Sequence, residues 1–195
     1  AIQKVTCNIG SSPMGGPFTK SDPPANLDWN QWLGQAPKVD YMKERAHYLF
    51  RWWYEYSGGK LTDWGAHHVD IAQWALDQNG EGQGVLELDP IVGEHQIPFK
   101  NGIPTKDNYF NTSHNFHIKC KFPNEVEMNI VSKSEEGNGI LFEGEKGNFF
   151  VTRGKLTGAA VDELKEKPLS SETVSAVYKG KKTTNHMENF FACMK

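Results

Sequence analysis

Two carboxylates and one imidazole share a side of the segment that most clearly predicts a helix. This segment covers residues 63–78 and ends before an Asn-Gly pair, which is a C-terminal stop signal. At about 100° per residue, Asp63, His67 and Asp70 fall at positions i, i+4 and i+7, within roughly 60° of one another. His68 points roughly 140° away from Asp63 on the same helical wheel.

This arrangement suits proton transfer to or from a substrate hydroxyl. A histidine exchanges protons near neutral pH, and a neighbouring carboxylate orients its imidazole and raises its basicity. The same residues also suit structural roles, because Asp63 is a good N-cap and paired Asp and His residues on helices are common outside active sites. The spacing by itself leaves both alternatives open.

The residues around this helix resemble the signature of a known enzyme family. The stretch GGKLTDWGAHHVDIAQW contains a glycine pair, a hydrophobic residue, D-x-x-x-H, and then a further Asp and Trp. This order and spacing resemble the Gfo/Idh/MocA family (glucose-fructose oxidoreductase, inositol dehydrogenase and rhizopine catabolism). The matching residues are Gly58, Gly59, Leu61, Asp63, His67, Asp70 and Trp74. The resemblance covers most of the chain, including the segments RWWYEY, ILFEGEKG and HMENFFACMK.

The resemblance implies a two-domain enzyme. Family members carry an N-terminal Rossmann domain that binds NAD or NADP, and a C-terminal α+β domain whose open sheet commonly forms the subunit interface. By this resemblance His67 is the acid/base for the hydroxyl being oxidised, and Asp63 orients His67 or binds substrate. The substrate is expected to be a small-molecule carbohydrate or polyol. Its pocket would be lined by Asp70, Trp53, Tyr54 and Trp64.

The nucleotide-binding half of such an enzyme is missing from the sequence. The glycines of GEGQG, at residues 80–84, follow a helix and precede a strand, which is the wrong order for the G-x-G-x-x-G pyrophosphate turn. The E-K-P motif that carries the family's catalytic lysine is also absent. We therefore expect residues 1–195 to be the substrate-binding and oligomerisation domain, clipped at its C-terminal end. We expect it to hold no cofactor and to be inactive alone.

Helical and irregular segments are predicted in the first part of the chain. An alternating pattern predicts a strand over residues 2–9, and a Gly/Pro/Ser-rich loop follows over residues 10–27. Asp28 is a suitable cap for a short helix that carries two tryptophans. Residues 44–56 (ERAHYLFRWWYEY) predict a helix or an extended arm, buried on most sides because aromatic side chains occur on nearly all of them.

The second part of the chain shows the two-residue period of antiparallel strands. Hairpins are predicted for residues 116–122 with 126–130 and for residues 140–143 with 148–152. A further strand is predicted over residues 173–178, and an amphipathic helix begins at residue 186. The predicted fold class is α+β: a predominantly antiparallel open sheet with helices packed on one face. The family resemblance implies the same architecture, similar to the C-terminal domain of glyceraldehyde-3-phosphate dehydrogenase.

Composition restricts the expected partners. A net charge of −3, with acids and bases interspersed, provides no basic stripe for nucleic acid. No apolar run approaches the ~18 residues that a transmembrane helix needs. The three cysteines form no C-x-x-C pair, so we expect them to be reduced. The six tryptophans fit either a carbohydrate-binding cleft or a large core.

Two other kinds of catalysis are compatible with some of these residues. A metal centre would need three converging ligands, but His67 and His68 diverge on the helix, and His114 and His117 diverge on a strand, so no metal site is expected. Some members of the same family cleave glycosidic bonds through a transient oxidation of the sugar. The pair of Asp63 and His67 would serve that reaction equally well.

A non-catalytic module is the remaining alternative. An antiparallel sheet domain can serve carbohydrate binding or oligomerisation, and the strand face of Val126, Met128 and Ile130 would seek a second copy if no helix covers it. We therefore expect a homo-oligomer formed through the sheet face. The sequence does not determine the substrate, the choice between NAD and NADP, or the cellular compartment.

Overall fold

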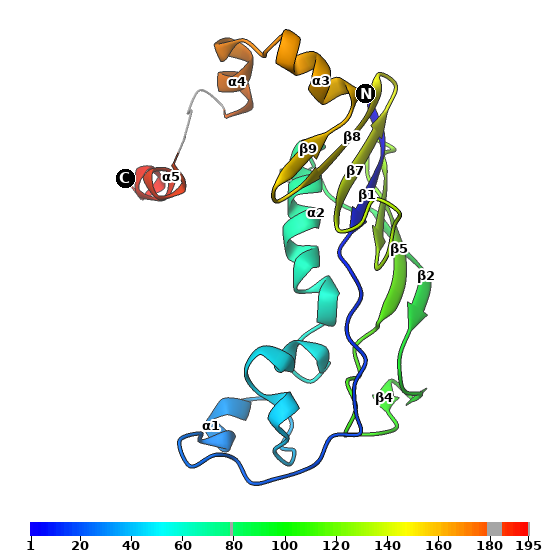
Figure 1. The fold of residues 1–195 in the computed structure, drawn as a ribbon, viewed down its shortest axis with the longest axis vertical. Coiled ribbons are helices and arrows are strands. Elements are labelled where there is room, and N and C mark those ends of the chain that lie inside the picture. Colours follow the sequence, from blue (N-terminus) through cyan, green and yellow to red (C-terminus); the bar gives the residue numbers. More distant parts are fainter. Residues whose placement is uncertain (79, 179–184, 195) are drawn as a thin grey trace.

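The computed structural model describes residues 1–78, 80–178 and 185–194, and its centre is a seven-stranded sheet (Figure 1). The strands are β1 (Ile2–Asn8), β2 (Glu87–Glu94), β5 (Asn115–Lys121), β6 (Glu127–Val131), β7 (Gly139–Gly144), β8 (Gly147–Thr152) and β9 (Lys155–Thr157). Their order across the sheet is β2-β5-β6-β1-β7-β8-β9. The neighbouring strands are antiparallel, except that β1 and β6 are parallel. The predicted α+β fold with a predominantly antiparallel sheet is therefore confirmed.

Alternation along the strands separates an inner, apolar face from an outer, polar face. The strand register aligns one inner row, formed by Cys120, Met128, Val5, Phe142 and Phe149. The adjacent outer row is formed by Lys121, Glu127, Lys4, Glu143 and Asn148. Both predicted hairpins form, because each turn joins two strands whose apolar residues face the same side.

Helix α2 (Trp64–Ala75) packs on the inner face of the sheet (Figure 1). Its buried residues, Gly65, His68 and Ala72, are spaced three and four residues apart and so form one stripe. Together with the sheet, this stripe buries Val126, Met128 and Ile130, none of which is more than 8% exposed. The face that the sequence analysis left open to a second copy is therefore covered by a helix.

The aromatic segment 44–56 differs from its prediction. It forms two short 3-10 helices, η1 (Lys43–Arg45) and η2 (His47–Trp52), rather than one long helix or an extended arm. His47 has a φ of 50°, which interrupts any continuous helix at that residue. Tyr48 is 68% exposed, so the expected burial holds for only part of the segment.

A second, smaller core lies beside this segment. It is formed by the buried residues Met42, Trp52, Trp53 and Phe110. The preceding helix α1 (Trp29–Leu33) begins as predicted, with Asp28 Oδ1 accepting a hydrogen bond from the amide of Gln31 at 2.9 Å. A further 3-10 turn, η3 (Gly59–Leu61), leads into α2, and a small hairpin of β3 (Phe99–Lys100) and β4 (Ile103–Pro104) lies outside the main sheet.

In the described part of the chain, the sheet is followed by the helices α3 (Ala159–Glu166), α4 (Ser171–Val177) and α5 (His186–Cys193). The prediction of a strand at residues 173–178 is wrong, because these residues belong mainly to α4. Ser170 caps this helix by accepting a hydrogen bond from the amide of Thr173 at 3.2 Å. The alternating apolar residues of this segment gave a strand pattern, but the capping serine initiates a helix instead.

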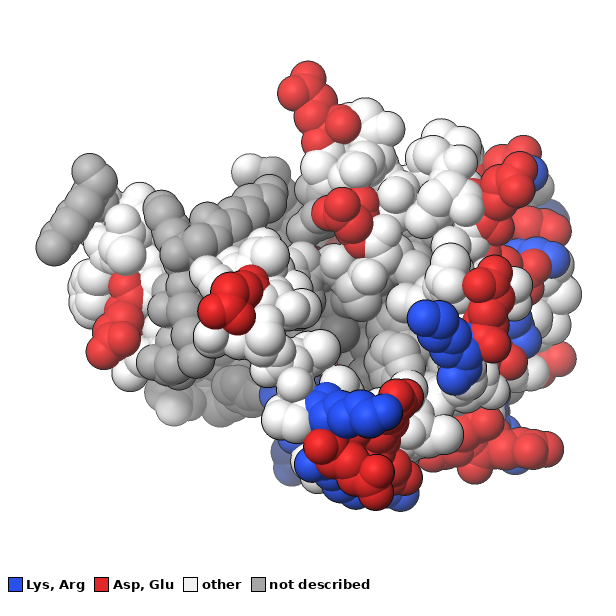
Figure 2. Space-filling view, turned by 90° about the horizontal axis from the view of Figure 1, so that it is seen from above, with Lys and Arg blue, Asp and Glu red and all other residues white. Residues whose placement is uncertain are grey.

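Charged residues of both signs occur on the face of the molecule that is seen from above (Figure 2). Seen from above, acidic and basic side chains lie next to one another, and neither sign forms a continuous stripe on that face (Figure 2). Among the described residues, no helix combines the length and the apolar character that crossing a membrane would require.

Candidate active site

The carboxylate of Asp63 is held between two cations at the start of α2. Asp63 occupies the N-cap position, but its side chain accepts no capping hydrogen bond. Its Oδ1 lies 3.0 Å from Nη1 of Arg51, and its Oδ2 lies 3.7 Å from Nζ of Lys60. All three side chains are less than one-fifth exposed. The anion is therefore fixed by partners that precede it in the chain.

Aromatic rings fix the two cations in turn. The guanidinium of Arg51 lies 3.7 Å from the ring centre of Tyr48 and 4.9 Å from that of Trp52. The ammonium of Lys60 lies 5.7 Å from the ring centre of Trp52 and 5.9 Å from that of Trp64. The aromatic segment thus acts as a platform that places positive charge beside Asp63.

The glycine pair of the motif has a steric role in this turn. Gly59 has a φ of +64°, a conformation that side chains with a Cβ rarely adopt. A Cβ at this position would lie 2.8 Å from both Ser12 and Thr112. Only glycine lets the chain pass this close to two neighbouring loops before α2 begins.

His67 lies one turn further along α2, and its imidazole is exposed. It borders a cavity of about 430 Å³ that is lined by Ala66, His67, His68, Asp70 and Ile71 of α2, Ile140 of β7, and Val151, Thr152 and Arg153 at the end of β8. Asp70 and His67 therefore open into one cavity, as their spacing predicts. The structure places no hydrogen bond between His67 and Asp63 within the described residues, since the Asp63 carboxylate is directed to Arg51 instead.

The adjacent histidine has a different environment. His68 is 3% exposed, and its Nδ1 donates a hydrogen bond to the backbone oxygen of Asn8 at 3.2 Å. Burial lowers the pKa of His68 below its ordinary value, because the charged imidazolium loses hydration. Both histidines border the cavity, but only His67 is exposed.

Trp64 links these groups. Its half-buried ring lies 5.9 Å from the ring of His67 and 5.3 Å from the ring of His68, with both contacts edge-on. The guanidinium of Arg153 lies 5.1 Å from the centre of the same ring. Trp64 therefore forms a wall behind the histidines rather than a freely exposed stacking platform.

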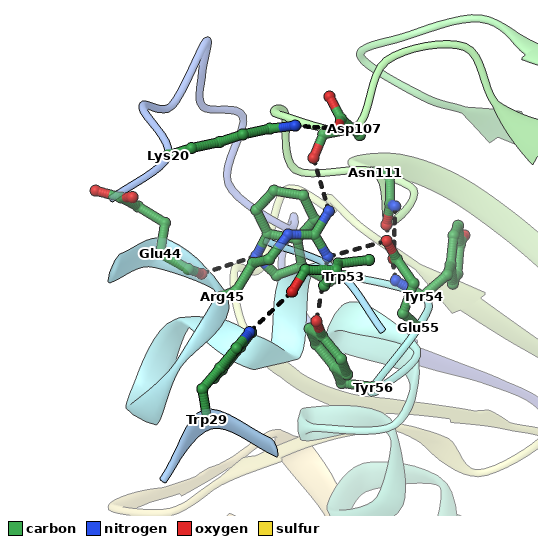
Figure 3. A network of polar contacts seen from close by, with 11 residues as sticks. Lys20, Trp29, Glu44, Arg45, Trp53, Tyr54, Glu55, Tyr56, Asp107 and Asn111 are labelled. Atoms are coloured by element: carbon green, nitrogen blue, oxygen red, sulfur yellow. Dashed lines mark hydrogen bonds and ion pairs between the residues drawn. The ribbon is translucent and has the colours of Figure 1, made fainter. Parts of the chain in front are cut away.

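Trp53 and Tyr54 do not line the His67 cavity but belong to the polar network around Arg45 (Figure 3). Trp53 is fully buried, and its Nε1 donates to the backbone oxygen of Glu44 at 2.7 Å. Tyr54 is 41% exposed, and its hydroxyl lies 3.0 Å from Nε2 of His95. It borders a second cavity of about 660 Å³ that it shares with Arg45, Glu55, Phe99 and Pro104, among others. The structure therefore separates these two residues from the His67 cavity.

Arg45 is the centre of this second region. Its guanidinium lies 4.0 Å from the ring centre of Trp53 and forms an ion pair with Glu55 at 3.1 Å. It also donates hydrogen bonds to the hydroxyl of Tyr56 and to the backbone oxygen of Asp107 (Figure 3). Burial raises the pKa of the Tyr56 hydroxyl, and the adjacent guanidinium opposes that shift.

Three arginines were missed by the sequence analysis. Two of them lie in the aromatic segment, where Arg45 pairs with Glu55 and Arg51 pairs with Asp63. The third, Arg153, lines the His67 cavity on the side opposite α2. An arginine between aromatic residues often makes a cation–π contact with one of their rings, and this signal would have identified Arg45 and Arg51. Nothing local marks Arg153, because its contact with α2 depends on the pairing of β7 with β8. Within the described residues, no three His, Cys, Asp or Glu side chains converge in the way that a metal centre needs.

A family model described as the C-terminal alpha/beta domain of an oxidoreductase family, Gfo/Idh/MocA, matches residues 17–154. The chain belongs to this family. The matched residues include α2 and β8, and therefore both walls of the His67 cavity. The Gfo/Idh/MocA resemblance inferred from the D-x-x-x-H motif is confirmed. A comparison with curated proteins found no match.

Proposed function

We propose that this chain is the substrate domain of an NAD(P)-dependent oxidoreductase that oxidises a hydroxyl group of a sugar or polyol. The observation that carries this proposal is the position of His67. Its imidazole is exposed on a small cavity beside Asp70, whereas the imidazole of His68 is buried and hydrogen-bonded to the backbone. One of two adjacent histidines is thus free to exchange a proton with a ligand.

In this proposal, the residues of this chain carry out the proton transfer of the reaction. Oxidation of a CH–OH group removes a hydride from carbon and a proton from oxygen, and His67 accepts that proton as a general base. The dinucleotide supplies the hydride acceptor when it is bound. The described residues do not provide a binding site for the dinucleotide, because β1 is followed by an irregular loop rather than by a glycine-rich turn and a helix. We propose that a separate nucleotide-binding domain holds it, and that residues 1–195 alone do not turn over.

Asp63 is proposed as a positioning residue. Its carboxylate is paired with Arg51 and Lys60, and both its oxygens face protein groups rather than the cavity. The ion pairs of Asp63 hold the first turn of α2 in place, and the position of this turn determines where His67 lies in the cavity. In an Asp63→Asn variant we expect a lower kcat, because His67 is displaced.

The test is the reduction of NAD or NADP by the full-length protein with a panel of neutral and acidic sugars and polyols. Replacement of His67 by Gln should lower kcat by roughly 100-fold or more. The matched control is His117→Gln, because His117 lies on the outer face of the sheet, where it contacts Asn129. Glycoside cleavage without net reduction would favour the glycosidase-type reaction. Equal activity of the His67 and His117 variants would rule out the proposed role of His67.

We also propose that the chain forms homo-oligomers through the outer face of the sheet. The inner face is covered by α2, so the outer rows are the surface that the sheet can offer to a second copy. One of these rows carries charges of alternating sign, in the order Lys121, Glu127, Lys4 and Glu143. A row of this kind is complementary to an inverted copy of itself.

A further inference from the structure

Arg153 is the cationic group of the His67 cavity. It follows Thr152 at the end of β8, and Gly154 turns the chain into β9 directly after it. Strand pairing brings this turn to α2, where the guanidinium lies 5.1 Å from the ring centre of Trp64. The arginine is therefore placed by a stacking contact on the same ring that backs His67.

The other two arginines of the chain are neutralised by carboxylates. Arg45 is paired with Glu55 at 3.1 Å, and Arg51 is paired with Asp63 at 3.0 Å. Arg153 has no carboxylate within 4.0 Å in the part of the chain that the structure describes. Its fork of N–H donors is thus free to bind a planar anion, which a guanidinium binds through two parallel hydrogen bonds.

We infer that the substrate of this site is a sugar acid, whose carboxylate binds Arg153 while one of its hydroxyl groups faces His67. This inference rests on the proposed function and specifies its substrate class. His67 and Arg153 both contact the ring of Trp64, at 5.9 and 5.1 Å from its centre, so they lie at most about 11 Å apart. A six-carbon chain with a hydrogen bond at each end bridges such a span.

The charge of the cavity selects a carboxylate over a phosphate. Asp70 lines the same cavity as Arg153, so one negative and one positive side chain share the space available to a ligand. A singly charged carboxylate is balanced by Arg153 and can keep its distance from Asp70. A doubly charged phosphate would be attracted to Arg153 and repelled by Asp70 with about twice the energy, so these two contributions offset each other while the dianion gives up more hydration.

The test is calorimetric titration of the full-length protein with glucuronate, gluconate, glucose and glucose 6-phosphate. We expect at least one of the two acids to bind roughly tenfold or more tightly than glucose, as a charged hydrogen-bonded pair provides. Arg153→Gln should abolish that preference by lowering the affinity for the acid to that for glucose. Lys155→Gln is the matched control, because it removes the same charge two residues away, on β9 and outside the cavity lining.

Each of the other outcomes is decisive. Equal affinities for the acids and for glucose would overturn the inference, as would an equal loss of preference in the Lys155 variant. Tighter binding of glucose 6-phosphate than of either acid would overturn the sugar-acid inference and indicate a sugar phosphate instead. The absence of any sugar binding would also refute the inference. The proposed function is judged separately, since a loss of cofactor reduction in His67→Gln with neutral sugars would uphold it even if Arg153 has no role.

Discussion

At the residue scale, two adjacent histidines show how the fold assigns different chemistry to the same side chain. His68 lies on the buried stripe of α2 with Gly65 and Ala72, and it satisfies one ring nitrogen on the backbone of β1. His67 is rotated away from the sheet by one helical step and borders the cavity. Helical geometry thus gives one histidine a structural role and leaves the other available to a ligand.

The buried histidine makes stability depend on pH. Burial lowers the pKa of His68 from its ordinary value of 6.5, so the unfolded chain binds this proton more readily than the folded chain. The stability it contributes is fully present above pH 6.5 and is lost as the pH falls from 6.5 through the folded pKa. The free energy of unfolding should therefore fall by up to about 1.4 kcal/mol per pH unit in this window.

Urea unfolding of the wild type and of His68→Gln across this pH range measures the effect. The glutamine can still donate to the backbone of Asn8 but carries no titrating group, so the variant should show a shallower slope. His95, whose pKa is also lowered by burial, remains in both proteins and cancels in the comparison. Identical slopes would contradict the assignment of this proton to His68.

The three thiols should differ in reactivity. Burial raises the pKa of Cys7 to about 12 and that of Cys120 to about 11, whereas Cys193 is exposed on α5. A disulfide reagent at neutral pH should modify Cys193 rapidly and the other two only after unfolding. A Cys193→Ser variant should lose the rapid phase. Rapid modification of a second thiol in that variant would show that the sheet core opens readily.

The candidate site could be predicted from sequence only where helical spacing decides the geometry. The positions of His67, His68 and Asp70 relative to one another follow from 3.6 residues per turn. The partner of Asp63 does not, because Arg51 reaches it across two 3-10 turns whose direction depends on packed aromatic rings. Tyr54 and Trp53 were grouped with the site from proximity in sequence, but the fold turns Tyr54 toward another cavity and buries Trp53 in the smaller core.

At the scale of elements, the Arg45 network ties the aromatic segment to the loop that follows β4. Arg45 lies on η1, its partner Glu55 lies just after η2, and Glu55 accepts a second hydrogen bond from Asn111 at 2.8 Å. The short 3-10 helices have few backbone hydrogen bonds of their own. We infer that the Arg45–Glu55 ion pair, rather than backbone hydrogen bonds, holds the aromatic segment in its conformation.

Removing the arginine should therefore destabilise the domain. Arg45→Gln leaves Glu55 without its cation in a site that is only 21% exposed, and we expect a loss of about 3 kcal/mol in the free energy of unfolding. Arg45→Lys should recover only part of it, because one ammonium cannot reach Glu55, Tyr56 and the Asp107 carbonyl together. A double-mutant cycle with Glu55→Gln measures the coupling, and strictly additive losses would contradict it.

Elements were predictable where one physical signal dominates the local sequence. The hairpins of β5–β6 and β7–β8 combine alternation with a turn, and α1 combines a cap with apolar residues, so each was identified. Segment 173–178 carried an alternating pattern and a serine cap, and the cap decided the outcome. The parallel pairing of β1 with β6 joins strands over 100 residues apart, which no local pattern specifies.

At the scale of the whole molecule, the sheet has two faces of opposite character. The inner rows pack against α2 and form the main core. On the outer face, the row that runs from Lys119 through Thr6 and Leu141 to Phe150 lies beside the alternating charges of Lys4 and Glu143. The side chains of Thr6, Leu141 and Phe150 are only half-buried, so an apolar strip borders a charged one on the surface proposed for self-association.

The charge pattern predicts how that association should respond to mutation. Lys4 and Glu143 form an ion pair at 3.2 Å within one chain, and exchanging them as Lys4→Glu with Glu143→Lys keeps this pair but breaks the alternation along the row. A dimer held by complementary rows should then dissociate, and the wild-type dimer should weaken as salt screens the charges. The matched control exchanges Asp162 and Lys165, an ion pair at 2.6 Å on α3. Light scattering in low and high salt measures the mass, and a swapped variant that stays dimeric would place the interface elsewhere.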